Sequence, residues 1–179
     1  MNNSNILKKA VKLDEQLFLT LFNYTSPRWF KTTALGLSKS GDGGFYLFIC
    51  AIVWWLSSNE HNQLLPLTML VGFAIERPIY FFAKKHFARI RPCDSLVNNA
   101  YIIPSDKFSL PSGHSAAAFL MAVILSHFFA EYTWLWFSWS SGIAASRVVL
   151  GVHFPTDIVI GALIGSVCGV LALALMAPL

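Results

Sequence analysis

Apolar segments separated by short polar stretches constrain the fold of this 179-residue chain more than any other feature. Backbone amides inside a bilayer must find hydrogen-bond partners within the protein, so we expect these segments to be helices. Several are shorter than the ~20 residues that cross a bilayer upright, and their ends must recruit neighbouring residues. The clear segments cover 45–56, 64–83, 115–130, 133–150 and 158–176.

The N-terminal region, residues 1–40, has a different character. Residues 6–24 mix charged residues with Leu13, Leu17 and Leu21 at helical spacing, which predicts an amphipathic helix at the membrane surface or a tilted first span. The chain begins without a compact apolar core and a small-residue cleavage site, so we expect no cleavable signal peptide. The predicted fold is an all-α, polytopic membrane bundle of five or six transmembrane helices, with 1–179 as one domain.

Composition argues against other classes of protein. With 55% hydrophobic and 12% charged residues, the chain is too apolar for an ordinary soluble domain. The net charge of +4 is small and no basic run alternates with aromatics, so we expect an anionic lipid rather than a nucleic acid as partner. Three scattered cysteines argue against a disulfide framework. Gly161, Gly165 and Gly169 recur every four residues, which favours close helix packing within the chain over a dimer interface.

Three polar clusters interrupt the apolar sequence between residues 84 and 157. They are Lys84 with Arg91-Pro92, Pro111-Ser112-Gly113-His114, and Ser146-Arg147 with His153 and Asp157. Ionisable groups at the ends of apolar spans are costly to desolvate, so three such clusters need a shared reason. Binding of one anionic group is the simplest.

The first cluster offers two cations. Lys84 and Arg91 are seven residues apart, two helical turns, so we expect both on one helix face, with Pro92 helping to end the helix. Arg91 offers a planar fork for two phosphate oxygens, and Lys84 a mobile point charge. Lys85 and Arg89 fit basic residues that snorkel to the membrane interface.

The second cluster stands immediately before an Ala-rich span. Unpaired N–H groups at a helix N-terminus favour an anion, and Gly113 lets the backbone approach it. Ser112 is placed to donate a hydrogen bond to a phosphate oxygen, although an ordinary N-cap explains it equally well. His114 is placed to protonate a leaving oxygen.

The third cluster pairs a histidine with a carboxylate. His153 and Asp157 are four residues apart, so Asp157 can fix the imidazole tautomer and leave the other nitrogen free to attack phosphorus. A buried structural hydrogen bond is the alternative. Arg147, beside Ser146, would add a further positive charge on the transferred group.

The spacings Lys-x6-Arg-Pro, Pro-Ser-Gly-His and Ser-Arg-x5-His-x3-Asp occur in this order, and together they resemble the type 2 phosphatidic acid phosphatase superfamily, the lipid phosphate phosphatases. The resemblance implies that His153 is the nucleophile, Asp157 its orienting carboxylate and His114 the general acid and then base. It implies a phosphohistidine intermediate and no metal or other cofactor. It also implies phosphate binding by Lys84, Arg91, Ser112, Gly113, Ser146 and Arg147.

The chain is similar to the small bacterial members of this superfamily, which act on lipids of the inner membrane. Undecaprenyl pyrophosphate is the first substrate we expect, and phosphatidylglycerophosphate, phosphatidic acid and lipid A are the alternatives. Vanadate-dependent haloperoxidases share the motifs, but they are soluble. Lys84, Arg91 and Arg147 would repel a metal cation. A non-catalytic lipid-phosphate carrier would need these cations but not a His153–Asp157 pair.

Two signals disagree about membrane orientation. The loops opposite the motifs, 57–63 and 131–132, contain no Lys or Arg, so the positive-inside rule places the motifs in the cytoplasm. The family resemblance implies a periplasmic or extracytoplasmic site in a multi-pass protein. We follow the resemblance, because phosphate binding explains many of the charges. Aromatic rings at the far ends of the spans indicate the opposite interface: Trp54, Trp55, Tyr132, Trp134 and Trp136.

Overall fold

The computed structural model describes residues 3–56, 60–97, 100–104 and 106–177, and these residues form helices and no strands. The order is α1 (Asn3–Tyr24), α2 (Arg28–Ser40), α3 (Gly43–Leu56), α4 (Glu60–Gln63), α5 (Leu65–Phe87), α6 (Pro92–Ser95), α7 (Gly113–Phe128), the 3₁₀ turn η1 (Ala130–Tyr132), α8 (Thr133–Val149) and α9 (Pro155–Met176). The five apolar segments predicted from the sequence correspond to α3, α5, α7, α8 and α9. Two described segments, Leu65–Ser95 and Pro155–Met176, are long and apolar enough to cross a membrane, whereas α3 and α7 are shorter.

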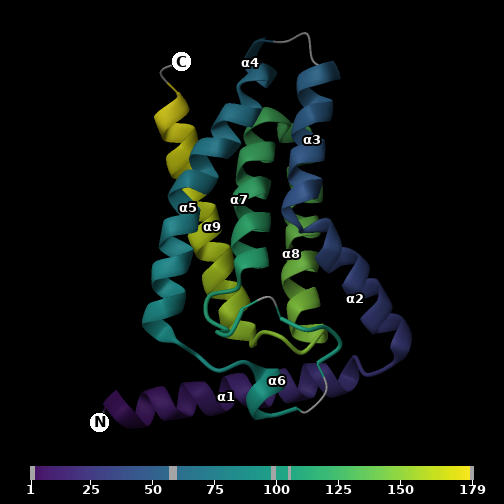
Figure 1. Cartoon of the computed structure of the whole chain (residues 1–179), viewed down its shortest axis with the longest axis vertical. Helices are drawn as coiled ribbons and strands as arrows, with labels where there is room; N and C mark the ends of the chain where they lie inside the picture. The colour runs from purple at the N-terminus through teal and green to yellow at the C-terminus, as the bar shows by residue number, and fades with distance from the viewer. Residues whose placement is uncertain (1–2, 57–59, 98–99, 105, 178–179) are drawn as a thin grey trace.

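Helix α7 is the centre of the bundle, with α5, α8 and α9 packed around it (Figure 1). Small residues permit this packing. A Cβ added at Gly165 would lie 2.0 Å from the carbonyl oxygen of Ala116, and one at Gly161 would lie 2.4 Å from that of Ser112. Because no side chain fits there, α9 contacts the backbone of α7 directly. The predicted use of these glycines for packing within the chain is confirmed.

Helix α1 lies across the end of the bundle at which α5 and α8 finish (Figure 1). Asp14 and Phe18 are buried, and Asp14 accepts hydrogen bonds from the Thr156 amide at 3.0 Å and from Arg89 at 2.7 Å. Leu13 and Leu17 are exposed on the other side. The helix thus docks on the protein through one face and presents an apolar stripe outward, as an amphipathic helix at a membrane surface would.

Helix α5 ends earlier than the sequence predicts. Ala88 adopts a left-handed conformation with φ of 44° and terminates the helix after Phe87. Arg91 has extended backbone and precedes α6, where Pro92 takes the first helical position. The prediction that Lys84 and Arg91 share one helix face is therefore wrong, because the helix ends between them.

The end of the bundle where α3 ends and α8 begins lies far from the helix ends that carry the three motifs (Figure 1). Trp54, Trp55 and Trp134 are exposed there, as expected for rings at a headgroup region. Trp136 differs, since it is only partly exposed and packs against the core.

Candidate active site

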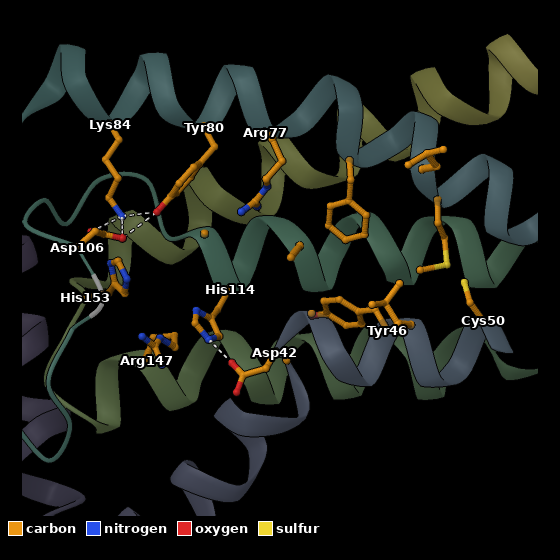
Figure 2. Close-up of a pocket in the computed structure, with 18 of the residues that line it drawn as sticks. Asp42, Tyr46, Cys50, Arg77, Tyr80, Lys84, Asp106, His114, Arg147 and His153 are labelled. Carbon is orange, nitrogen blue, oxygen red and sulfur yellow. Dashed lines mark hydrogen bonds and ion pairs between the residues drawn. The ribbon is translucent and has the colours of Figure 1, made fainter. Parts of the chain in front are cut away.

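Six of the nine predicted site residues line a cavity of about 660 Å³ between α3, α5, α7 and α8, and Ser112, Ser146 and Asp157 lie outside its lining (Figure 2). Its polar end is lined by Lys84, Arg91, Gly113, His114, Arg147 and His153. Its other end is lined by apolar side chains, among them Leu47, Met69, Leu70 and Phe73. The cavity therefore joins a strongly cationic region to an apolar one.

His153 lies in the short turn between α8 and α9, and only 2% of it is exposed. Its Nδ1 faces Asp157 Oδ2 at 3.6 Å, longer than a hydrogen bond, and has no other partner. Its Nε2 lies 3.3 Å from Arg91 Nη1 at the edge of the cavity. Burial is the main reason that the pKa of His153 is lowered to about 4. The Asp157 carboxylate raises this pKa, but by less than burial lowers it. The imidazole is neutral at pH 7, so one nitrogen has a free lone pair.

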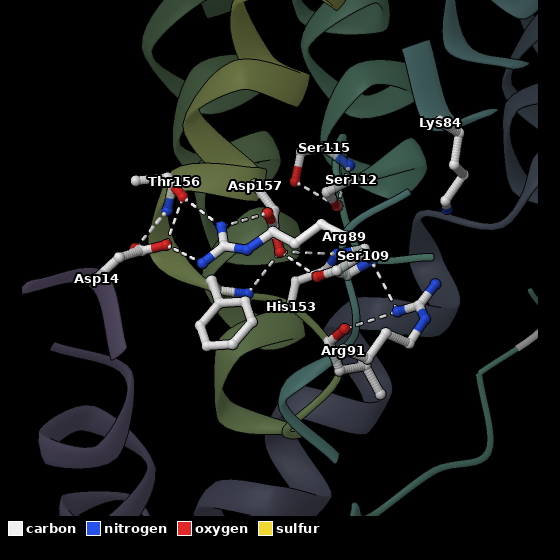
Figure 3. A network of polar contacts seen from close by, with 12 residues as sticks. Asp14, Lys84, Arg89, Arg91, Ser109, Ser112, Ser115, His153, Thr156 and Asp157 are labelled. Carbon is white, nitrogen blue, oxygen red and sulfur yellow. Dashed lines mark hydrogen bonds and ion pairs between the residues drawn. The ribbon is translucent and has the colours of Figure 1, made fainter. Parts of the chain in front are cut away.

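Asp157 is fixed by three neighbouring groups (Figure 3). Its Oδ2 accepts from the Phe154 amide at 2.8 Å and from the Ser109 hydroxyl, and Oδ1 accepts from Arg89 at 2.9 Å. Arg89 also bonds Asp14, so it links α1 to α9 through two buried carboxylates. The interpretation of Arg89 as a snorkelling residue is wrong. Breaking such a buried ion pair typically costs about 3–5 kcal/mol.

Asp106 occupies the cationic end of the cavity. Lys84 Nζ lies 2.7 and 2.8 Å from its two carboxylate oxygens, Arg91 Nη2 donates at 2.7 Å and Tyr80 donates at 2.9 Å. Burial alone would raise the pKa of Asp106, but the hydrogen bonds from Lys84 and Arg91 outweigh it and lower that pKa to about 2. An acidic side chain thus sits where a bound phosphate would meet the same donors. Sequence reasoning missed this residue, because a single Asp in a connecting loop has no motif.

A second carboxylate faces His114. Asp42, in the turn between α2 and α3, places its Oδ1 3.0 Å from His114 Nε2 (Figure 2). Glycines flank Asp42 on both sides, but the sequence gives no sign that this turn reaches α7. Asp42 is a positioning candidate for His114 that only the tertiary fold reveals.

The remaining predicted residues support the cavity in different ways. Gly113 lines it, and a Cβ there would meet the Tyr80 ring at 2.9 Å. Ser112 is buried behind it and caps α7 by accepting from the Ser115 amide at 3.4 Å, so the N-cap reading of Ser112 holds. Ser146 is also buried and donates to the Ile143 carbonyl at 2.6 Å. Neither hydroxyl lines the cavity.

Arg147 completes the cationic group from α8. It is 5% exposed, donates to Ser38 and keeps its Nε without a partner. Three cations and the N-terminus of α7 therefore face one volume, an arrangement suited to an anion with several oxygens. In the part of the chain that the structure describes, no three His, Cys, Asp or Glu side chains are grouped to hold a metal ion.

Comparison with known proteins agrees with this chemistry. Residues 63–178 match the model of the PAP2 superfamily. The bacitracin transport permease protein BcrC of Bacillus licheniformis is 26% identical over 68% of this chain and 60% of its own length. An undecaprenyl-diphosphatase of Sulfolobus acidocaldarius is 28% identical over 82% of this chain and 70% of its own length. The crystal structure of Aquifex aeolicus LpxE superposes with a TM-score of 0.74 at 27% identity, covering 89% of this chain and 93% of that one.

The family prediction made from the three motifs is confirmed, and the named phosphatase relative supports a lipid phosphatase that hydrolyses its substrate. The matched region contains all three motifs and the cavity residues on α5, α7 and α8. This chain is a member of the PAP2 superfamily.

Proposed function

We propose that this protein is a multi-pass membrane phosphatase that removes the terminal phosphate of a lipid phosphate or pyrophosphate through a phosphohistidine at His153. The observation that carries the proposal is the position of His153 Nε2 at the edge of a cavity shared by Lys84, Arg91 and Arg147. A nucleophile and three cations around one volume match the needs of phosphoryl transfer, which are in-line positioning and stabilisation of charge on the equatorial oxygens.

The proposed reaction has two steps. His153 Nε2 forms a bond to phosphorus while the bond from phosphorus to the leaving oxygen breaks, and His114 gives that oxygen a proton. Water then attacks the phosphohistidine, His114 takes a proton from the water, and inorganic phosphate leaves. Asp157 stabilises the imidazolium of the intermediate, and a small movement of the ring would shorten the 3.6 Å separation to a hydrogen bond.

Undecaprenyl pyrophosphate is the substrate we place first. The apolar end of the cavity, with Leu47, Met69 and Phe73, can hold the part of a lipid chain next to its phosphate. A relative named undecaprenyl-diphosphatase supports the same choice. Phosphatidylglycerophosphate, phosphatidic acid and lipid A are the alternatives to test beside it.

We place the protein in the bacterial inner membrane, with the cavity opening toward the periplasmic or extracytoplasmic side. In this orientation α9, which begins beside the cavity, ends in the cytoplasm. A reporter that is active only in the cytoplasm should therefore be active when it is fused to the C-terminus. A periplasmic reporter signal would overturn the orientation and leave the proposed reaction untouched.

The function is tested by phosphate release from the four lipids by detergent-purified protein. We expect one preferred lipid, and complete loss of release in a folded His153→Ala variant. Lys85→Ala removes an exposed charge outside the cavity and should retain nearly full activity. Absence of release from every lipid would favour the non-catalytic carrier, and equal losses in the two variants would contradict the role of His153.

A further inference from the structure

A fourth cation, outside the three motifs, lines the same cavity. Arg77 lies on α5, seven residues before Lys84, and two helical turns bring both side chains to one face of the helix. A guanidinium within an apolar segment is costly unless it binds something. Neither the motifs nor the proposed transfer step uses Arg77.

The contacts of Arg77 orient its guanidinium and leave part of it free. Glu76, which is fully buried and outside the cavity lining, bonds the Nε atom. The guanidinium stacks 4.9 Å from the centre of the Tyr80 ring, and its Nη2 atom is buried without a partner. A buried donor that lacks a partner is destabilising, and more so when it is charged. The Nη2 atom of Arg77 is therefore held in place and unsatisfied.

The location of Arg77 indicates what could satisfy it. In Figure 2 its guanidinium projects into the cavity on the side facing His114, between the cationic end at Lys84 and the apolar end. A phosphate beside His153 would direct its leaving oxygen toward His114. Whatever group carries that oxygen must then pass beside Arg77 before it reaches the apolar end.

We propose that Arg77 binds the second, retained phosphate of a lipid diphosphate, so that this site selects diphosphates over monophosphates. The inference rests on the proposed phosphatase function. The terminal phosphate is transferred to His153, the bridging oxygen takes the proton from His114, and it stays on the retained phosphate. That phosphate is a strong anion before and after the transfer, and a guanidinium fork matches two of its oxygens. A lipid monophosphate has an uncharged alcohol carbon at this place.

The test compares farnesyl diphosphate with farnesyl monophosphate, because the two differ only in the retained phosphate. In Arg77→Gln we expect kcat/KM for the diphosphate to fall about 10- to 100-fold, the range for a lost charge-assisted contact, and kcat/KM for the monophosphate to change less than about threefold. Arg77→Lys should recover part of the loss. Lys85→Gln, which removes an exposed cation from the same helix, should leave both substrates unchanged.

A second measurement needs no variant. Methylenediphosphonate should inhibit hydrolysis of the monophosphate at least about tenfold more strongly than methylphosphonate does in the unaltered protein, because only the former reaches Arg77. Equal inhibition by the two, or equal losses on both substrates in Arg77→Gln, would overturn the inference. If the unaltered protein hydrolyses only the monophosphate, the inference is also overturned, whereas the proposed function stands. Activity on neither substrate, together with no release from the four lipids named above, would refute the proposed function itself.

Discussion

Replacing Asp106 should strengthen the binding of phosphate to the resting protein. Its carboxylate holds Lys84 and Arg91 at 2.7 Å, so an incoming phosphate must displace it before meeting the same cations. The pKa of Asp106 is lowered to about 2, which keeps the carboxylate ionised at any working pH. Asp106 therefore competes with the substrate as an internal anion.

The size of the effect follows from the ion pairs of Asp106. A decrease in pKa from 3.8 to about 2 corresponds to roughly 2 kcal/mol of favourable interaction with the ionised form. Because 36% of the side chain is exposed, solvent screening reduces this to about 1–2 kcal/mol. Release of that competition should tighten phosphate binding about 5- to 30-fold.

The assay is inhibition of lipid-phosphate hydrolysis by inorganic phosphate, measured in Asp106→Ala and in the isosteric Asp106→Asn. We expect a lower inhibition constant in both variants. Asp94→Asn, an exposed residue of the same connection, is the matched control and should leave the constant unchanged. An unchanged or higher inhibition constant in the Asp106 variants would refute competition and assign Asp106 to positioning of the cations.

Three further predictions follow from packing and charge. Gly165→Ala places a methyl group 2.0 Å from the Ala116 carbonyl oxygen and should lower stability by about 1–3 kcal/mol. Gly36→Ala is the control, because the space around Gly36 is open, and it should be neutral or stabilising. Equal melting temperatures of the two variants in detergent would contradict this. The pKa of His153 is lowered from 6.5 to about 4, so the unfolded chain binds more protons in this window and stability should fall by up to about 3 kcal/mol as pH drops through it. The melting temperature of His153→Gln should depend less on pH, and identical profiles would refute the assignment. Because cationic side chains stabilise the phosphate charge, activity should persist in excess chelator, and a loss rescued only by a divalent ion would contradict metal independence.

Patterns local in sequence predicted much of the fold. Apolar length located α3, α5, α7, α8 and α9 to within a few residues. The four-residue glycine repeat predicted the close packing of α9, and the position of Ser112 before an Ala-rich span gave its cap as one of two equal alternatives. These features depend on neighbours along the chain, which the sequence displays.

Long-range contacts were not predictable in this way. Asp42 reaches His114 across 72 positions, and Arg89 reaches Asp14 across 75, without any periodicity to mark either pair. The early end of α5 was also missed, because no glycine marks the left-handed residue Ala88. The motifs identified the cations and histidines that line the cavity, while the carboxylates that contact them emerged only from the tertiary structure.

Trapping of the phosphorylated protein tests the proposed mechanism most directly. With p-nitrophenyl phosphate, whose leaving oxygen needs no proton, the His114→Gln variant should still accept phosphate but hydrolyse the intermediate slowly, since it lacks the general base. After rapid quenching with base, which preserves phosphohistidine, peptide mass spectrometry should find the phosphate on His153. Phosphate on another residue, or turnover by a folded His153→Ala variant, would contradict the mechanism.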